Sequence, residues 1–293
     1  MLITERKGGK REKMLAWSAI ITCVICVFLF ERLIPGASFV WDQDALPLAH
    51  PWVWGPVSVV YLAVVLLLER HLGASKAEKY GASWFVNLAV FHNYFLATLS
   101  LLMFVGTCYE YGVLLYTEGF RAGNCHAHGA AESGRLFWWS YIYFLSKYLE
   151  LLDTVIIVLR RAQLTFLHVY HHSLVLLMSY LWLQYQLRFH FVGVIFNSFV
   201  HIFMYQFFAA CLTGRQLWWK KHLTGLQIVQ FISSFVLALP YLYYDLSPNL
   251  PQITLGLHCT GSQSFLFSMP LNLSFLVLFW RLYQRSYVQK KSD

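Results

Sequence analysis

Long apolar stretches dominate this sequence and restrict the folds that are open to it. A helix that crosses a bilayer needs about 20 mostly apolar residues. The chain of 293 residues offers such candidates at residues 15–33, 56–70, 84–106, 136–159, 166–185, 191–212, 225–244 and 265–283. We therefore expect an all-α, polytopic membrane protein with about eight spans.

The composition supports a membrane protein. Hydrophobic residues make up 58% of the chain and charged residues only 12%. A soluble domain carries about 25% charged residues, so this chain has too little polar side chain to cover a water-exposed surface. The same figures exclude disordered, collagen-like, coiled-coil and small disulfide-rich proteins. No Ser/Gly-rich linker divides the sequence, and residues 1–293 are expected to form a single domain.

The Lys and Arg residues indicate the orientation, because basic residues stay in cytoplasmic loops. With the N-terminus in the cytosol, 17 of the 22 fall on the cytosolic side, 4 fall on the opposite side, and Lys147 lies inside a span. This split favours a multi-pass protein with both termini in the cytosol. The clusters lie between apolar runs, so the net charge of +8 does not indicate nucleic-acid binding.

Both ends of the chain resemble targeting signals. Residues 15–30 follow a basic start, as in a signal peptide, but Glu31 and Arg32 come next without a clean cleavage site. We expect a retained helix. Lys290 and Lys291 resemble the dilysine retrieval signal of endoplasmic reticulum membrane proteins. The endoplasmic reticulum membrane is therefore the expected location. The alternative is a solvated basic tail.

Three cysteines fall on the lumenal side, where disulfides persist. Cys125 and Cys259 lie in predicted loops, whereas Cys108 follows a span directly. We predict a disulfide between Cys125 and Cys259. Free thiols are the alternative, because sequence alone does not fix connectivity.

Ionisable residues inside a span are costly and are therefore candidates for function. In the fourth span Lys147, Glu150, Asp153 and Thr154 recur every three or four residues and share one helix face. The structural alternative is an internal salt bridge between Lys147 and Glu150 that holds helices together.

Three histidines open the fifth span. His168, His171 and His172 stand at i, i+3 and i+4, so their imidazoles converge on one face. One buried histidine is usually a satisfied core residue. Three at this spacing indicate either a metal site or an acid–base and nucleophile cluster.

The next two spans carry further polar stripes. They consist of Asn197, His201 and Tyr205 at i, i+4 and i+8, and of Thr224, Gln227 and Gln230 at i, i+3 and i+6. Asn and Tyr can orient a histidine by hydrogen bonds, although a polar seam between helices is the alternative. The last stripe alone is weak, since amides often join membrane helices.

The stripes lie near the cytosolic ends of their spans. At about 1.5 Å per residue, Asp153 and His171 are both about 8–9 Å below the cytosolic face. We expect the four stripes to surround one buried cavity that opens to the cytosol. A cationic collar suited to a phosphorylated ligand is predicted around its mouth, from Arg160, Arg161, Lys220 and Lys221. Plain positive-inside topology is the alternative.

Together the four stripes resemble the boxes of the ELO family of fatty acid elongases. The sequence reads KYLELLDT at 147–154, HVYHH at 168–172, NSFVHIFMYQFF at 197–208 and TGLQIVQ at 224–230, in the order of that family. Phe207 and Phe208 replace its usual paired tyrosines, which puts any role for those hydroxyls in doubt. The family has seven spans, so the first helix here is an addition.

The resemblance implies a fold and an activity. The fold is a helical barrel of six or seven transmembrane helices around a narrow acyl tunnel, here residues 56–283, with an extra helix in 1–35 and a tail at 284–293. The activity is that of a very-long-chain 3-oxoacyl-CoA synthase, an acyltransferase that condenses a long-chain acyl-CoA with malonyl-CoA. The products are 3-ketoacyl-CoA, CO2 and CoA. The family also suggests a homodimer.

Further enzymes must complete the elongation cycle. No redox cofactor motif is present, so a 3-ketoacyl-CoA reductase, a dehydratase and an enoyl reductase are the expected partners. No cofactor and no metal are expected for the condensing step itself.

The residues suggest how condensation proceeds. No cysteine lies near the boxes, and a neutral imidazole can attack a thioester. We expect His171 to take the acyl group, and His201 with Asn197 to assist decarboxylation or stabilise the enolate. The remaining catalytic candidates orient or complete this network: His168, His172, Asp153 and Glu150. The substrate-binding candidates are Lys147, Tyr205, Thr224, Gln227, Gln230, Arg161, Lys220 and Lys221. A histidine that acts as general base in a ternary complex is the competing route.

Two other classes of protein share some of these features. Membrane di-iron desaturases also use a His-x-x-His-His box, but they need about eight histidines in three cytosolic boxes, and no second cluster occurs here. A proton-coupled carrier would suit an intramembrane Lys–Glu–Asp stripe. The polar groups gather toward one face, however, which favours an acyl pocket over a through-route.

Overall fold

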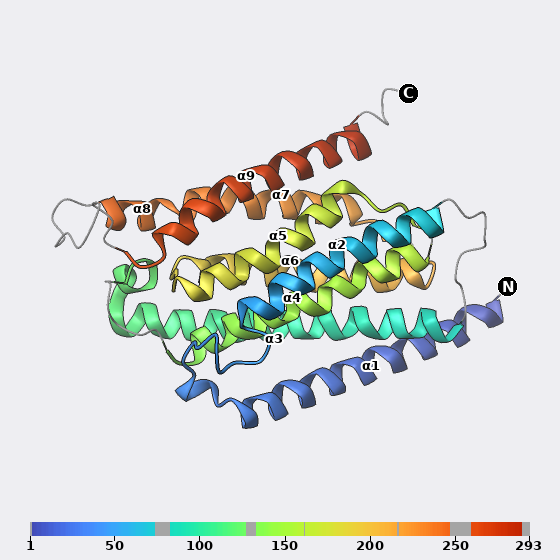
Figure 1. Cartoon of the computed structure of the whole chain (residues 1–293). Helices are drawn as coiled ribbons and strands as arrows, with labels where there is room; N and C mark the ends of the chain where they lie inside the picture. The colour runs from blue at the N-terminus through green and yellow to red at the C-terminus, as the bar shows by residue number, and fades with distance from the viewer. Residues whose placement is uncertain are drawn as a thin grey trace.

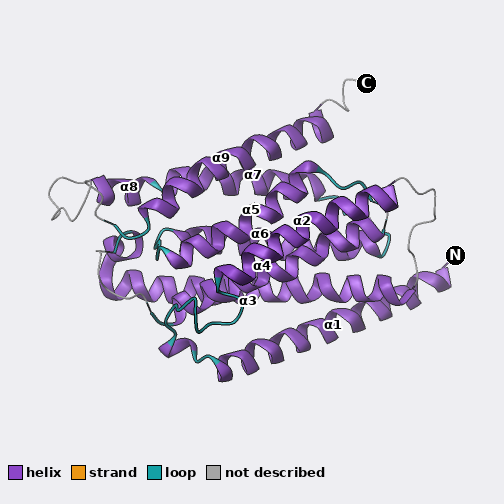
Figure 2. Cartoon of the chain, viewed as in Figure 1, coloured by secondary structure: helices purple, strands orange, loops and turns teal. Residues whose placement is uncertain are grey.

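The computed structural model describes residues 2–73, 83–126, 133–160, 162–215, 217–246 and 259–288. Within these residues the chain is helical and contains no β-sheet (Figures 1 and 2). The α-helices are α1 (Leu2–Leu33), α2 (Pro51–Gly73), α3 (Ser83–Asn124), α4 (Arg135–Leu159), α5 (Phe166–Gln184), α6 (His190–Leu212), α7 (Lys220–Leu237), α8 (Leu239–Leu246) and α9 (Ser262–Tyr283). The prediction of an all-α protein is confirmed.

Six of the described helices are long and apolar enough to cross a membrane: α1, α2, α3, α6, α7 continued by α8, and α9 continued to Val288. The chain is therefore a multi-pass membrane protein. Helices α4 and α5 were also predicted as spans. Their average apolarity is similar to that of the other helices. They are not among the six because α4 carries Lys147, Glu150 and Asp153, and α5 opens with three histidines.

Helix α3 is longer than the sequence predicted. The apolar run ends near residue 106, but the helix continues to Asn124 with one break at Gly119, where φ is 86°. A glycine tolerates this positive φ because it has no Cβ. The extension carries α3 along the whole bundle, as Figure 1 shows. The start of α1 and the end of α9 lie at the same end of the bundle.

Helix α1 packs along α3 through a narrow stripe. Glu12, Ala19 and Cys23 are buried and spaced seven and four residues apart, which places them on one helix face. Trp17 and Phe28 lie on other faces and are exposed, as expected for side chains that face lipid. The helix predicted as an addition therefore forms part of the folded bundle.

The opposite end of the bundle is tied by two features. A disulfide joins Cys125, just after α3, to Cys259, just before α9, with the Cα atoms 5.1 Å apart. These are the two cysteines that the sequence analysis pairs. The connection between α1 and α2 also packs inward there, where Trp41 Nε1 donates to Gln184 Oε1 at 3.1 Å.

Candidate active site

Two adjoining cavities lie among α4, α5, α6, α7 and α9. The first, the polar cavity, has a volume of about 250 Å³ and is lined by Asp153, His168, His171, His172, Asn197, His201, Lys220, Thr224, Gln227 and Gln230, together with apolar side chains. The second, the apolar cavity, has a volume of about 40 Å³. His171, Asn197, Gln230 and Phe231 line both cavities. Three of the four predicted stripes therefore meet at one junction.

The apolar cavity leads toward the disulfide end of the bundle. Its walls are mainly large apolar side chains: Val175, Met178, Trp182, Leu187, Phe189, Val192, Phe196, Met269 and Phe275. Gly193 lets α6 approach α5 closely, since an added Cβ would lie 3.0 Å from the Trp182 indole. Such a lining suits a hydrocarbon chain.

His171 is the one box histidine that lines both cavities. Its ring packs 4.8 Å from that of Phe275 and 5.6 Å from that of His172, centroid to centroid. Among the described residues, its Nδ1 is buried and has no hydrogen-bond partner. A buried polar atom without a partner is costly, and functional sites are where such atoms are retained. His171 is thus positioned to contact a reacting group.

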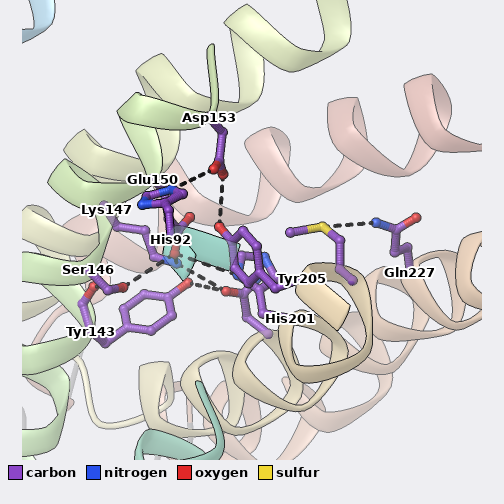
Figure 3. A network of polar contacts seen from close by, with 11 residues as sticks. His92, Tyr143, Ser146, Lys147, Glu150, Asp153, His201, Tyr205 and Gln227 are labelled. Atoms are coloured by element: carbon purple, nitrogen blue, oxygen red, sulfur yellow. Dashed lines mark hydrogen bonds and ion pairs between the residues drawn. The ribbon is translucent and has the colours of Figure 1, made fainter. Parts of the chain in front are cut away.

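Lys147 lies inside a network rather than in a cavity wall (Figure 3). It is 3% exposed, and its Nζ donates to Glu150 Oε1 at 2.6 Å and to Asn197 Oδ1 at 3.3 Å. The ammonium also sits 3.9 Å from the centroid of the Tyr143 ring. Lys147 was predicted to bind substrate, but in the structure its ammonium group is paired with the Glu150 carboxylate.

The network fixes the orientation of the Asn197 amide and of His201. Asn197 Oδ1 accepts from both Lys147 and the Tyr143 hydroxyl, the latter at 3.0 Å, so the oxygen must face these donors. The Asn197 amide nitrogen then points to His201 Nε2, 3.3 Å away. His201 Nδ1 lies 3.6 Å from Glu150 Oε1. This arrangement favours the tautomer with the proton on Nδ1 and an accepting Nε2.

Asp153 contacts an imidazole that the sequence analysis did not single out. Its Oδ1 is 2.9 Å from His92 Nε2 on α3, and its Oδ2 accepts from the Tyr205 hydroxyl at 3.1 Å. Asp153 therefore links α3, α4 and α6. Tyr205, predicted to bind substrate, is fully buried and directed at this carboxylate. The sequence does contain a signal for His92, because it is an ionisable residue within the predicted span 84–106.

The first two boxes contact each other directly. His168 Nε2 lies 2.8 Å from the Thr154 hydroxyl, which lies 2.8 Å from the Tyr61 hydroxyl on α2. The rings of His168 and His172 are 4.2 Å apart. Tyr61 was also missed, since a tyrosine in an apolar run carries little signal by itself. These contacts hold the start of α5 against α4 and α2.

The fourth stripe and the cationic residues are only partly brought together. Thr224, Gln227 and Gln230 line the polar cavity, and Gln227 Nε2 donates to the Met204 sulfur at 3.8 Å. Of the predicted collar residues that the structure describes, Lys220 lines this cavity. Lys221 is directed at the Tyr283 ring, with Nζ 5.9 Å from its centroid, and Arg160 lines a neighbouring cavity. Arg161, Lys290 and Lys291 lie outside the described residues.

Several other groups bear on the site. Phe207 and Phe208, which replace the family's tyrosines, line the polar cavity with apolar rings.

Within the described part of the chain, no group of three or more His, Cys, Asp and Glu side chains is arranged to hold a metal ion.

Comparison with known proteins identifies the family of this chain. Residues 46–293 match the ELO family, described as GNS1/SUR4. Fatty acid elongase A of Dictyostelium discoideum is 34% identical over 255 residues, covering 87% of this chain and 90% of that protein. Fatty acid elongase sre1 of the same organism is 30% identical over 86% of this chain and 89% of its own length. Very long chain fatty acid elongase 7 of Rattus norvegicus is 30% identical over 66% of this chain and 71% of its own length.

Proposed function

Since the chain belongs to the ELO family and acts in fatty acid elongation, we propose that it catalyses the condensing step. A long-chain acyl-CoA and malonyl-CoA give 3-ketoacyl-CoA, CO2 and CoA. One observation carries the proposal. Of the box histidines, His171 alone stands at the junction of a polar cavity and an apolar cavity. A thioester carbonyl must lie at such a junction if its acyl chain occupies the apolar side.

The first half of the reaction transfers the acyl group to His171. The acyl chain enters the apolar cavity and the CoA moiety remains on the side of the polar cavity. The lone pair of the neutral imidazole attacks the thioester carbonyl, and the carbon–sulfur bond breaks. The imidazole proton passes to the departing thiolate, so free CoA and an uncharged acyl-imidazole result.

The second half forms the new carbon–carbon bond. Malonyl-CoA occupies the polar cavity, loses its carboxylate as CO2 and leaves an enolate. The enolate carbon attacks the acyl carbonyl, and the imidazole departs and takes a proton from solvent. Asn197 lines the polar cavity, where the enolate oxygen would form. His201 Nε2 accepts one amide proton of Asn197 and so fixes the amide nitrogen. The second amide proton is then the fixed donor that we propose for the enolate oxygen, and a donor at such a position lowers the barrier. The net reaction consumes one proton.

The buried network positions these groups rather than binding substrate. Lys147 and Tyr143 hold the Asn197 amide, and Glu150 lies beside His201 Nδ1. Partners of this kind fix the tautomer and direction of an imidazole. The route requires no metal and no redox cofactor. The reductase, dehydratase and enoyl reductase of the cycle act on the product.

The proposed location is the endoplasmic reticulum membrane with both termini in the cytosol. The start of α1 and the end of α9 lie at one end of the bundle (Figure 1). The helices and the connection at that end carry basic residues, as the positive-inside rule requires for a cytosolic face. They are Arg11 in the first third of α1, Arg215 between α6 and α7, Lys220 at the start of α7 and Arg281 near the end of α9. The polar cavity, which Lys220 lines, then faces the cytosolic supply of CoA esters.

The experiment is a condensation assay with purified protein in detergent. Malonyl-CoA and a panel of acyl-CoAs are supplied without NADPH, and 3-ketoacyl-CoA and CO2 are followed by mass spectrometry. We expect product from the native protein and from His222→Ala, a control at an exposed histidine of α7, but none from His171→Ala. Product formation that survives His171→Ala would overturn the proposal.

A further inference from the structure

Helix α1 lies outside the matched family region, which begins at residue 46, yet it carries a buried carboxylate. Glu12 is 7% exposed and faces α3. Its Oε1 accepts from the Tyr94 hydroxyl at 2.7 Å and from the guanidinium of Arg215. A carboxylate at this depth is stable only when it is paired and hydrogen-bonded. These two contacts therefore account for its presence in α1.

Arg215 belongs to the connection between two helices of the active site. Helix α6 carries Asn197 and His201, and α7 begins at Lys220 in the polar cavity wall. The connection turns at Gly214, where φ is 76°, and Arg215 N donates to Ala210 O at 2.9 Å. Its position sets where α7 starts relative to α6.

The connection reaches the cavity wall through a second contact. The Trp219 ring packs against that of Phe207, with centroids 5.9 Å apart, and Phe207 lines the polar cavity. A shift of the connection therefore moves both Trp219 and Lys220. Both residues lie at the end of the polar cavity where the chain passes from α6 to α7.

Close packing does not hold this connection to α1. A cavity of about 640 Å³ lies between α1, α3 and the connection, lined by Gly9, Arg11, Glu12, Leu15, Val86, Asn87, Val90, Thr213, Gly214 and Arg215. Among the described residues, an ion pair between Glu12 and Arg215 spans it, and the Tyr94 hydroxyl on α3 contacts both side chains. The position of the connection therefore depends on a polar tether to α1.

We propose that α1 is a positioning element for CoA substrates, and that Glu12 acts by holding Arg215 and the α6–α7 connection in place. The expected effect of Glu12 on the affinity for CoA substrates rests on the proposed function. Its expected effect on the position of the α6–α7 connection is independent of that function. The reacting groups at His171 lie elsewhere, so loss of the tether weakens substrate binding and leaves the chemical step nearly unchanged.

The size of the effect follows from the burial of the two partners. An ion pair between two exposed side chains contributes little. Here the Arg215 side chain is 57% exposed but that of Glu12 is only 8% exposed, and Glu12 also receives the Tyr94 hydrogen bond. We therefore expect KM for the CoA substrates to rise about five- to tenfold on loss of either partner, with kcat within about twofold.

The test combines kinetics with hydrogen exchange. Glu12→Leu, Arg215→Ala and the double variant are compared with the native protein, and Arg11→Gln, an exposed neighbour on α1, is the matched control. Exchange at the Gly214 and Arg215 amides is expected to accelerate about tenfold in all three variants but not in the control. Exchange in the double variant should match that in the single ones, because each substitution removes the same Glu12–Arg215 ion pair. Arg215→Lys should restore part of the KM loss.

The outcomes separate this inference from the proposed function. Unchanged exchange at Gly214 and Arg215, or additive effects of the two substitutions, would overturn the tether. Loss of kcat at unchanged KM would also overturn it. If the native protein forms no 3-ketoacyl-CoA, the proposed function fails, and the exchange measurement still decides whether α1 holds the connection. Arg215→Ala lies at the surface and keeps the test valid if Glu12→Leu folds poorly.

Discussion

Removal of the Lys147 ammonium tests whether this residue positions the site or binds substrate. Lys147→Met keeps the length of the side chain and deletes its charge. Glu150, which is 2% exposed, then retains the Ser146 hydroxyl at 3.3 Å and the His201 ring at 3.6 Å. Removing one partner of a buried ion pair costs about 3–5 kcal/mol. Because these two neighbours remain, we expect about 3 kcal/mol.

This loss is measurable as a change in thermal unfolding. For a chain of this size, about 3 kcal/mol corresponds to a fall of about 6–12 °C in the unfolding midpoint. The informative variant is Lys147→Met combined with Glu150→Gln, because replacing both members of a buried pair is often close to neutral. We expect the double variant to recover at least about half of the lost stability. Thermal unfolding in detergent, followed by intrinsic tryptophan fluorescence, provides the assay.

The same variants separate positioning from binding in the kinetics. If Lys147 holds Asn197 and thereby His201, its loss lowers kcat and leaves KM nearly unchanged. The double variant stays slow, since Glu150→Gln also weakens the contact with His201 Nδ1. A double variant no more stable than Lys147→Met would refute the ion-pair reasoning. A rise in KM at constant kcat would return Lys147 to the substrate-binding residues.

Three further changes probe other parts of the structure. His92→Leu leaves Asp153 with the Tyr205 hydroxyl as its hydrogen-bond partner among the described residues. The free energy of unfolding should fall by about 1–3 kcal/mol, and a denaturant titration that shows no such loss would contradict the contact between His92 and Asp153. Reduction of the Cys125–Cys259 disulfide, or Cys125→Ser, should cost about 2–5 kcal/mol, and reductant should then have no further effect on the variant's unfolding midpoint. Gly193→Val places a side chain against the Trp182 indole in the wall of the apolar cavity. The products of an acyl-CoA panel should then shift to shorter chains, whereas an unaltered product profile would show that the acyl chain lies elsewhere.

The sequence was sufficient to predict most of the helices and many of the polar residues that line the two cavities. Apolar length alone locates a span, because a bilayer imposes one thickness on every crossing helix. Helical periodicity identified the residues that share a face, and His171, Asn197, His201 and Gln230 do meet at the cavities. The end of α3 at Asn124 was not predictable in this way, since an amphipathic extension has no long apolar run.

Contacts between helices were beyond the reach of periodicity. A stripe on α4 shows which side chains point the same way, but not which helix they face. His92 beside Asp153, and Tyr143 beside Asn197, come from how α3, α4 and α6 pack. For the same reason Lys147 seemed available to substrate, although Glu150 and Asn197 enclose it. The tether from Glu12 to Arg215 joins residues about 200 positions apart and carries no local signal.

The central claim, that His171 carries the acyl group, is tested most directly by trapping that intermediate. Purified protein is mixed with a long-chain acyl-CoA in the absence of malonyl-CoA, quenched in acid within milliseconds, digested and analysed by mass spectrometry. An acyl-enzyme route predicts a peptide that contains His171 and is heavier by the mass of one acyl group, together with release of one equivalent of CoA. The adduct should disappear when malonyl-CoA is added before the quench. An unmodified His171 peptide, from protein that makes 3-ketoacyl-CoA when both substrates are present, would contradict the account and favour a ternary complex in which a histidine acts as general base.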